Sequence, residues 1–207
     1  MFELIGAGGW LMLPIIFCSV ISLAIVIERS WVLRRENILP SKLLRELNNP
    51  ATRIGVDKNS IVSSGGDSFL GFLFISAFAK KNDGYDAMRT SAENAAIFVE
   101  HELLRNLGTL GTIAAITPLL GLLGTVIGMI TVFGVVETAG GGFTSALAGG
   151  ISQALITTAA GLIVAIPTLF FQRYFERKVD ELLVFLAGDC ERFIELLSKK
   201  NESSLQG

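Results

Sequence analysis

Three long apolar stretches constrain this chain more than any other feature of its sequence. They run from about Trp10 to Ile27, from Leu107 to Val136 and from Gly149 to Phe171, and a membrane-spanning helix needs about 20 predominantly apolar residues. With 51% hydrophobic and 17% charged residues, the chain is also too apolar for a soluble domain of 207 residues. We therefore predict an all-α integral membrane protein with three transmembrane helices.

Two other segments resemble spans or targeting signals but are interpreted differently. The run from Phe69 to Ala79 is only eleven residues long, a length more typical of a buried core helix, and Asp67 is its expected N-cap. Met1 to Gly9 has no basic region, and no small-residue cleavage site follows the first span. We expect that span to be retained as an anchor rather than removed as a signal peptide.

The basic residues predict the orientation of the chain. No Lys or Arg precedes Arg29, and none lies between Arg105 and Arg173. Because cytoplasmic loops carry the excess of Lys and Arg, the N-terminus is expected outside and the C-terminus inside. The expected layout is a periplasmic N-terminus (1–9), a first span (10–28), a cytoplasmic helical loop (29–105), a second span (106–136), a periplasmic loop (137–148), a third span (149–172) and a cytoplasmic C-terminal helix (173–207).

The cytoplasmic segments read as long helices. No helix breaker occurs from Tyr85 to Gly108, so this helix is expected to run directly into the second span. The C-terminal helix carries an apolar stripe at near-heptad spacing. The stripe packs either on this chain's own loop helices or on identical neighbours; its members are Val179, Leu182, Leu186, Cys190, Phe193 and Leu197.

No pattern in the sequence predicts an enzyme, a metal centre or a cofactor site. The single histidine, His101, lies between two glutamates on a helix, which is typical of a surface residue. Cys18 lies in the first span and Cys190 in the cytoplasmic tail, so a disulfide between them is not expected. The expected partners are the lipid bilayer and other membrane proteins, and no nucleic acid.

Small residues follow one face of the second and third spans. Gly121, Gly124 and Gly128 recur at three- to four-residue spacing, which lets helix backbones approach closely in lipid. Their counterparts in the third span are Ala154, Thr158, Gly161, Ala165 and Thr168. Pro118 and Pro167 can kink these helices near their cytoplasmic ends.

Hydroxyl groups on these two spans have two interpretations. Thr125 and Thr158 lie in the inner parts of their spans, where they either line a polar passage or donate to neighbouring backbone carbonyls. Between Arg105 and Arg173 the only ionisable residue of note is Glu137, at the outer end. If the chain conducts protons, the titrating group must come from another polypeptide.

Two motifs carry a family resemblance. The run TPLLGLLGTVIGM (Thr117 to Met129) followed by ALITTAAGLIVAIP (Ala154 to Pro167) resembles the ExbB/TolQ/MotA proton-channel superfamily. The three-span layout with a large cytoplasmic loop is similar to its ExbB/TolQ branch, whereas MotA-type subunits have four spans. The resemblance covers essentially the whole chain.

The resemblance implies a ring-forming oligomer, usually a homopentamer, around a dimer of single-span ExbD- or TolR-like partners whose membrane aspartates carry the proton. Thr125 and Thr158 correspond to the threonines that face this aspartate. The implied function is ExbB-like, an inner-membrane proton channel that uses the proton motive force to energise TonB-dependent outer-membrane transport. A TolQ-like role in Tol-Pal envelope integrity, with a TolA-like transducer, remains open.

Gln153 departs from the family pattern. Several relatives carry a glutamate at this position, and an amide can hydrogen-bond but cannot titrate. Thr157, beside Thr158, adds a hydroxyl that could favour sodium, although protons are the expected ion. A non-conducting membrane scaffold also stays open, and it would tolerate the loss of Thr125 and Thr158. A solute transporter is expected to show internal repeats or broken helices, which this sequence lacks.

Overall fold

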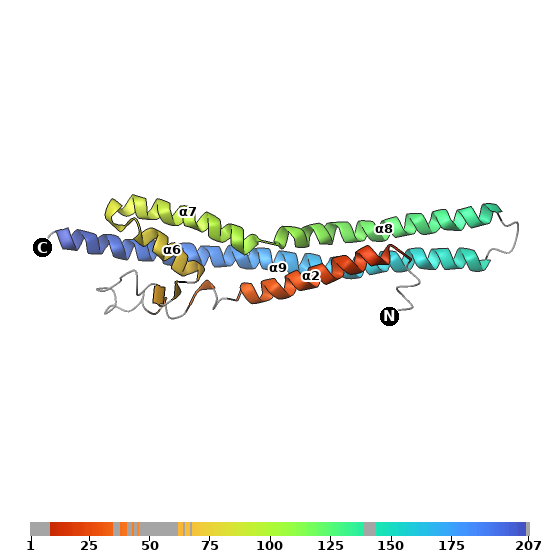
Figure 1. The fold of residues 1–207 in the computed structure, drawn as a ribbon, viewed down its shortest axis with the longest axis horizontal. Coiled ribbons are helices and arrows are strands. Elements are labelled where there is room, and N and C mark those ends of the chain that lie inside the picture. Colours follow the sequence, from red (N-terminus) through yellow and green to blue (C-terminus); the bar gives the residue numbers. More distant parts are fainter. Residues whose placement is uncertain are drawn as a thin grey trace. The chain divides into compact units, whose positions relative to one another are not determined.

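The computed structural model describes residues 9–34, 38–40, 43, 45, 62–63, 65–66, 68–138 and 144–205. Within these residues the chain is helical and has no strand (Figure 1). Its elements are α2 (Met12–Val32), α6 (Phe69–Phe78), the short 3-10 helix η2 (Lys81–Asp83), α7 (Tyr85–Leu104), α8 (Leu107–Thr138) and α9 (Thr144–Leu205). Most of the expected N-terminus (1–8) and part of the expected outer loop (139–143) lie outside the described residues.

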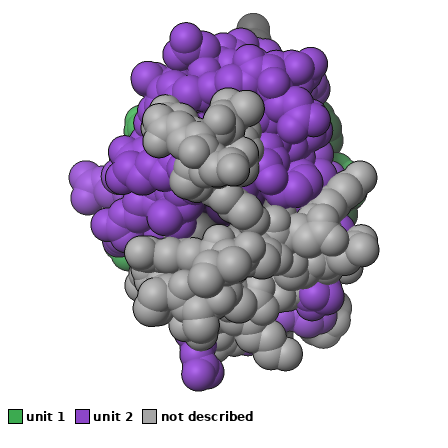
Figure 2. All heavy atoms as spheres, turned by 90° about the vertical axis from the view of Figure 1, so that its left-hand side faces the viewer, with its two compact units in different colours: residues 1–28, 106–174 green, residues 29–105, 175–207 purple. Residues whose placement is uncertain are grey.

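The chain divides into two compact units, coloured separately in Figure 2. Unit 1 comprises residues 1–28 and 106–174, and unit 2 comprises residues 29–105 and 175–207. Three helical segments of the described chain are long and apolar enough to cross a membrane; they lie within Met12–Val32, Tyr85–Gly134 and Ala148–Lys199. The prediction of an all-α protein with three transmembrane helices is confirmed.

One face of α2 in unit 1 is apolar and exposed. Leu13, Phe17, Val20 and Ile27 each expose more than 60% of their surface, and their spacing of three, four and seven residues places them on one side of the helix. Exposed apolar stripes of this length are unusual on soluble proteins. A helix that crosses the bilayer turns such a stripe toward lipid.

The short apolar helix α6 is a buried element of unit 2. Leu70, Leu73, Phe74 and Ala77 are 2% exposed or less, which confirms the interpretation of this segment as a core helix. Its N-cap is Ser68, whose hydroxyl accepts a hydrogen bond from the Gly71 backbone at 3.1 Å. The expectation that Asp67 would cap it is wrong, because the next residue already provides the side-chain acceptor that a cap requires.

The apolar stripe of the C-terminal helix is buried within the chain itself. All six residues, from Val179 to Leu197, are 5% exposed or less. Phe193 stacks on Phe74 of α6 with ring centroids 4.2 Å apart and planes 8° apart. Of the two alternatives, packing on the chain's own loop helices is therefore confirmed for this stripe.

The expected continuous helix from Tyr85 into the second span is interrupted. Helix α7 ends at Leu104 and α8 begins at Leu107, so this prediction is wrong. At the break, Asn106 adopts a left-handed backbone conformation with φ 63°, which Asn tolerates better than most residues. In unit 1 its side-chain amide donates to the Glu28 carboxylate at 3.0 Å. The sequence alone does not predict this interaction.

A buried arginine closes the C-terminal end of α7 in unit 2. Arg29 is 1% exposed, and its Nη1 donates to the carbonyls of Glu102 and Leu103 at 3.2 and 3.3 Å. The last carbonyls of a helix lack intrahelical partners and carry partial negative charge, so a cation there is favourable. The sequence pattern indicates Arg29 only as an orientation signal.

Candidate functional site

Helices α8 and α9 meet in unit 1 along a seam of small residues. A Cβ atom on Gly121 would lie 3.0 Å from both the Thr157 carbonyl oxygen and the Thr158 Cα. A Cβ atom on Gly124 would lie 2.3 Å from the Thr157 hydroxyl. Since few real Cβ atoms approach other atoms as closely as 3.0 Å and essentially none approach to 2.3 Å, glycine at these positions lets the two backbones lie in near contact.

The same contact continues along both helices. A Cβ atom on Gly161 of α9 would lie 2.7 Å from the carbonyl oxygen of Thr117. Near the other end of the seam, a Cβ atom on Gly128 would lie 3.1 Å from the Cβ atom of Ala154. The structure thus brings together the four glycines singled out in the sequence on one α8–α9 contact.

Thr157 and Thr158 occupy different places on this contact. Thr158 is partly exposed, and its hydroxyl donates across the seam to the Gly121 carbonyl at 3.1 Å. Thr157 is 1% exposed, and its hydroxyl donates to the Ala154 carbonyl of its own helix at 2.8 Å. Thr158 therefore links two helices and retains an exposed edge, whereas Thr157 fills the space left by Gly124.

Thr125 follows Gly124 directly and remains partly exposed. Its hydroxyl donates to the Leu122 carbonyl at 2.7 Å. All three threonine hydroxyls thus donate to backbone carbonyls, as one of the two interpretations expects. A hydroxyl that donates its only proton still has lone pairs with which to accept a hydrogen bond. Exposed Thr125 and Thr158 can therefore act as oriented acceptors.

Gln153 lies beside the start of α2 in unit 1. A Cβ atom on Gly9, which has φ 71°, would lie 2.2 Å from the Gln153 side-chain nitrogen. This places the amide side chain against the Gly9 backbone, one helical turn before Thr157. The Gln153 side chain thus lies against Gly9, while the Gln153 backbone carbonyl accepts a hydrogen bond from the Thr157 hydroxyl at 3.1 Å.

The two prolines lie inside helices that continue through them, Pro118 in α8 and Pro167 in α9. Proline cannot donate a backbone hydrogen bond. The threonine beside each proline bonds the preceding turn: Thr117 donates to the Ile113 carbonyl at 2.6 Å and Thr168 to the Val164 carbonyl at 2.7 Å. Both threonines are buried, so we interpret Thr117 and Thr168 as residues that pack between helices.

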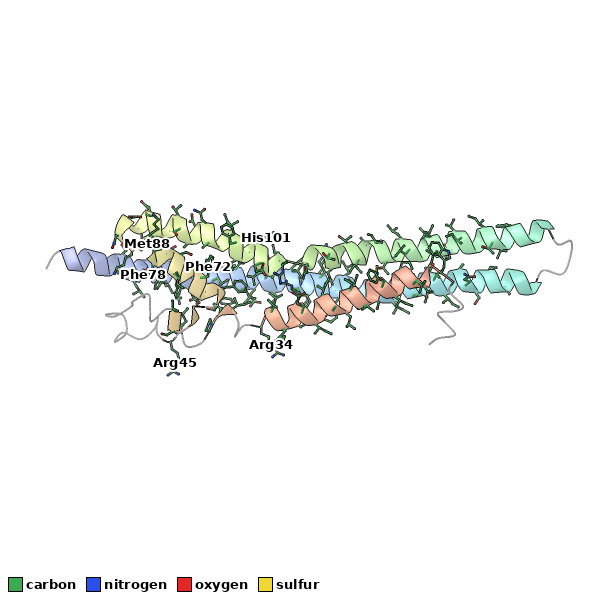
Figure 3. The ribbon with its side chains drawn as sticks, viewed as in Figure 1. Arg34, Arg45, Phe72, Phe78, Met88 and His101 are labelled. Atoms are coloured by element: carbon green, nitrogen blue, oxygen red, sulfur yellow. The ribbon has the colours of Figure 1, made fainter. Side chains whose placement is uncertain are left out.

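The described residues offer no group of three or more His, Cys, Asp or Glu side chains that could hold a metal ion. His101 is exposed near the end of α7 (Figure 3). Cys18 and Cys190 are free thiols. Burial raises the pKa of the Cys190 thiol to about 12, with a smaller contribution from the neighbouring Glu191. A buried, protonated thiol is chemically inert at neutral pH.

Comparison with known proteins gives this geometry its context. The MotA/TolQ/ExbB proton channel family matches residues 66–186, more than half of the chain. The chain belongs to this family. Its members are channel and transport proteins, and together with the three apolar helices this places the chain in the bacterial inner membrane as a multi-pass protein.

The more similar relatives are ExbB and ExbB-like proteins. The chain is 30% identical over 177 residues to biopolymer transport protein ExbB-like 3 of Synechocystis, covering 82% of this chain and 81% of the relative. It is 35% identical over 125 residues to biopolymer transport protein ExbB of Aquifex aeolicus, covering 58% and 84%. Against ExbB-like 1 of Synechocystis it is 32% identical over 169 residues and spans 66% of that relative's length.

Proposed function

We propose that this chain is the ring-forming subunit of an inner-membrane proton channel that works with an ExbD-like single-span partner. The observation that carries the proposal is the α8–α9 seam, where Thr158 bridges to the Gly121 carbonyl with part of its surface exposed. Such a wall has polar acceptors but no carboxylate. It fits a family of proton channels in which a second polypeptide supplies the titrating group.

The layout that supports this function is the one predicted from the charges. The chain crosses the membrane with residues 10–28, 106–136 and 149–172, and residues 29–105 and 173–207 form the cytoplasmic part. Residues 1–9 and 137–148 then face the periplasm. The distribution of all 17 Lys and Arg residues supports this orientation through the positive-inside rule.

The proposed pathway uses the oriented hydroxyls of Thr125 and Thr158. Because each hydroxyl proton is donated to a carbonyl, its oxygen is left to accept from water or from a protonated carboxyl group. A partner aspartate facing these oxygens is stabilised in its neutral form when it donates to them. Five copies would repeat this pair of acceptors around the partner helices.

Proton flow through the ring supplies the work of the complex. One elementary charge crossing the membrane releases about 2.3 kcal/mol per 100 mV. In the proposed function this energy moves the partner dimer, which passes it to a TonB-like transducer for transport across the outer membrane. The names of the relatives, all biopolymer transport proteins of ExbB type, support this role over a TolQ-like one.

A reconstitution experiment tests the proposal. The chain is co-expressed with a single-span ExbD-like protein from the same genome, the complex is purified, and its native mass is measured before reconstitution into vesicles that contain a pH-sensitive dye. We expect a ring of about five copies with two partners, and proton uptake that needs both polypeptides. A stable oligomer that binds no partner and passes no protons would favour the scaffold instead.

A further inference from the structure

Two pairs of large apolar side chains lie on the outside of unit 2. Ile97 and Phe98 on α7, here the α7 pair, expose 64% and 70% of their surface. Val184 and Phe185 on α9, here the α9 pair, expose 72% and 42%. Successive helical residues are about 100° apart, so Ile97 and Val184 each lie opposite the buried stripe of their own helix.

Lipid does not account for these exposed side chains. Along α9, Val184 lies eleven residues after Arg173, the first basic residue beyond the third span, which is about 17 Å at 1.5 Å per residue. The intervening turns are highly charged. They carry Glu176, Arg177, Lys178, Asp180 and Glu181. The α7 pair is likewise followed by charged residues before α8 begins; these are Glu100, Glu102 and Arg105.

The two pairs lie at the same level along unit 2. In this unit α7 and α9 run antiparallel (Figure 1). A cavity of about 190 Å³ is lined by Leu73 of α6, by residues of α7 from Arg89 to Ala96 and by residues of α9 from Ala187 to Ile194. Ala96 is thereby level with Ala187. The α7 pair directly follows Ala96 and the α9 pair lies two or three residues before Ala187, so the levels agree to about 3 Å.

We propose that the α7 pair of one copy packs against the α9 pair of the next copy in the ring. This inference rests on the proposed ring and locates its cytoplasmic contact. Copies in a cyclic ring are related by rotation alone, so two different patches can meet only when they lie at the same level along the axis. In the proposed ring, α9, which is a single helix from the third span into unit 2, runs along the ring axis.

The surface beside the α9 pair has room for a neighbouring side chain. Gly188 lies one turn after Val184, and a Cβ atom there would meet nothing within 4 Å. Ala187, between them, is small and exposed. An aromatic ring such as that of Phe98 can occupy this recess, as knobs fill holes between packed helices.

Cross-linking between differently tagged copies tests the contact. In a background carrying Cys18→Ala and Cys190→Ala, one copy carries Ile97→Cys and the other Val184→Cys, and both are expressed with the single-span partner. Membranes are treated with a short bis-maleimide, and the products are separated by tag and size. The matched control replaces Ile97→Cys by Thr90→Cys, which is exposed on the same face of α7 but about 10 Å further from the α9 pair's level.

We expect a strong heterodimer band for the Ile97–Val184 combination and only background for Thr90–Val184. A complex of ring mass that gives no such band, or equal bands for both combinations, would overturn the contact while leaving the channel proposal intact. A cross-link to the single-span partner instead would assign the patch to that protein and also overturn it. A single-chain native mass would overturn ring and contact together.

Discussion

The two halves of helix α9 pack by opposite chemistry. In unit 1 its residues meet α8 through glycine and threonine, with Gly161 against the Thr117 carbonyl and Thr158 bonded to Gly121. In unit 2 the same helix buries a stripe of large apolar side chains, and Phe193 stacks on Phe74. One continuous helix thus packs through small residues in unit 1 and through large apolar residues in unit 2.

The difference follows from the solvent around each half. In lipid, burying an aliphatic side chain gains little, so close backbone approach and hydrogen bonds between helices drive association. In water, burial of apolar surface is the dominant favourable contribution. The comparison predicts that large-to-small changes damage unit 2 most, whereas small-to-large changes damage unit 1 most.

Phe74→Ala is expected to have the largest effect on stability. Phe74 is 2% exposed, and removing a buried phenylalanine ring typically costs about 3–5 kcal/mol. Thermal unfolding of the purified complex measures the loss. Phe72→Ala is the matched control, because Phe72 lies on the same helix and is 45% exposed (Figure 3). Equal losses for both variants would contradict the packing described for unit 2.

Gly124→Leu is expected to disrupt the close packing of small residues between α8 and α9 in unit 1. The new side chain would meet Thr157 at less than contact distance, and overpacking of this kind costs about 1–3 kcal/mol. We expect the assembled complex to be lost or reduced on a native gel. Gly134→Leu introduces the same side chain on α8 where a Cβ atom meets nothing within 4 Å, so it should assemble normally. Assembly of both variants would argue against the seam.

The reactivity of Cys190 tests whether the core of unit 2 excludes solvent. With its pKa raised to about 12 by burial, the thiol stays protonated at pH 8, so alkylation should be about a hundredfold or more slower than in the unfolded chain. Stability should not depend on this group well below the unfolded pKa of about 8.5, and should fall as the pH rises through that value because only the unfolded thiol ionises. Mass spectrometry after iodoacetamide treatment measures the rate of Cys190 alkylation in a Cys18→Ala background. Rapid alkylation of the folded chain would show that this core is open.

Gln153→Glu is expected to have the smallest effect. The Gln153 side chain lies against Gly9 rather than on the Gly124–Thr157 contact, so a polar side chain of similar size should preserve assembly and most proton flux. The vesicle assay with the single-span partner measures this directly. A large loss, or a large gain, of flux would give this position a direct part in the pathway.

Much of the fold could be predicted because membrane spans and helix stripes each extend over many residues. Spans are recognised by their apolar composition and stripes by their regular spacing. The buried stripe from Val179 to Leu197 followed from its spacing alone. The break at Arg105 and Asn106 could not, since no glycine or proline marks it and it depends on the backbone of Asn106 and on a contact with Glu28. A break of this kind depends on a single tertiary contact.

The residues of the α8–α9 contact could be singled out from the sequence, but their individual placements could not. Spacing and family motifs singled out the glycines and threonines of α8 and α9. The distinct placements of Thr157 and Thr158 depend on where Gly124 meets α9, which no single-helix pattern specifies. The burial of Arg29 was missed because its carbonyl partners are more than 70 residues away in the sequence.

The most direct test of the central claim is proton flux through vesicles containing Thr158→Val together with the single-span partner. Valine preserves the volume of threonine but removes the hydroxyl that bonds Gly121 and offers an acceptor to the pathway. We predict a complex of normal mass whose flux falls roughly tenfold, equivalent to about 1.4 kcal/mol in the barrier, while Thr158→Ser conducts normally. Wild-type flux through Thr158→Val would contradict the pathway proposed for this chain.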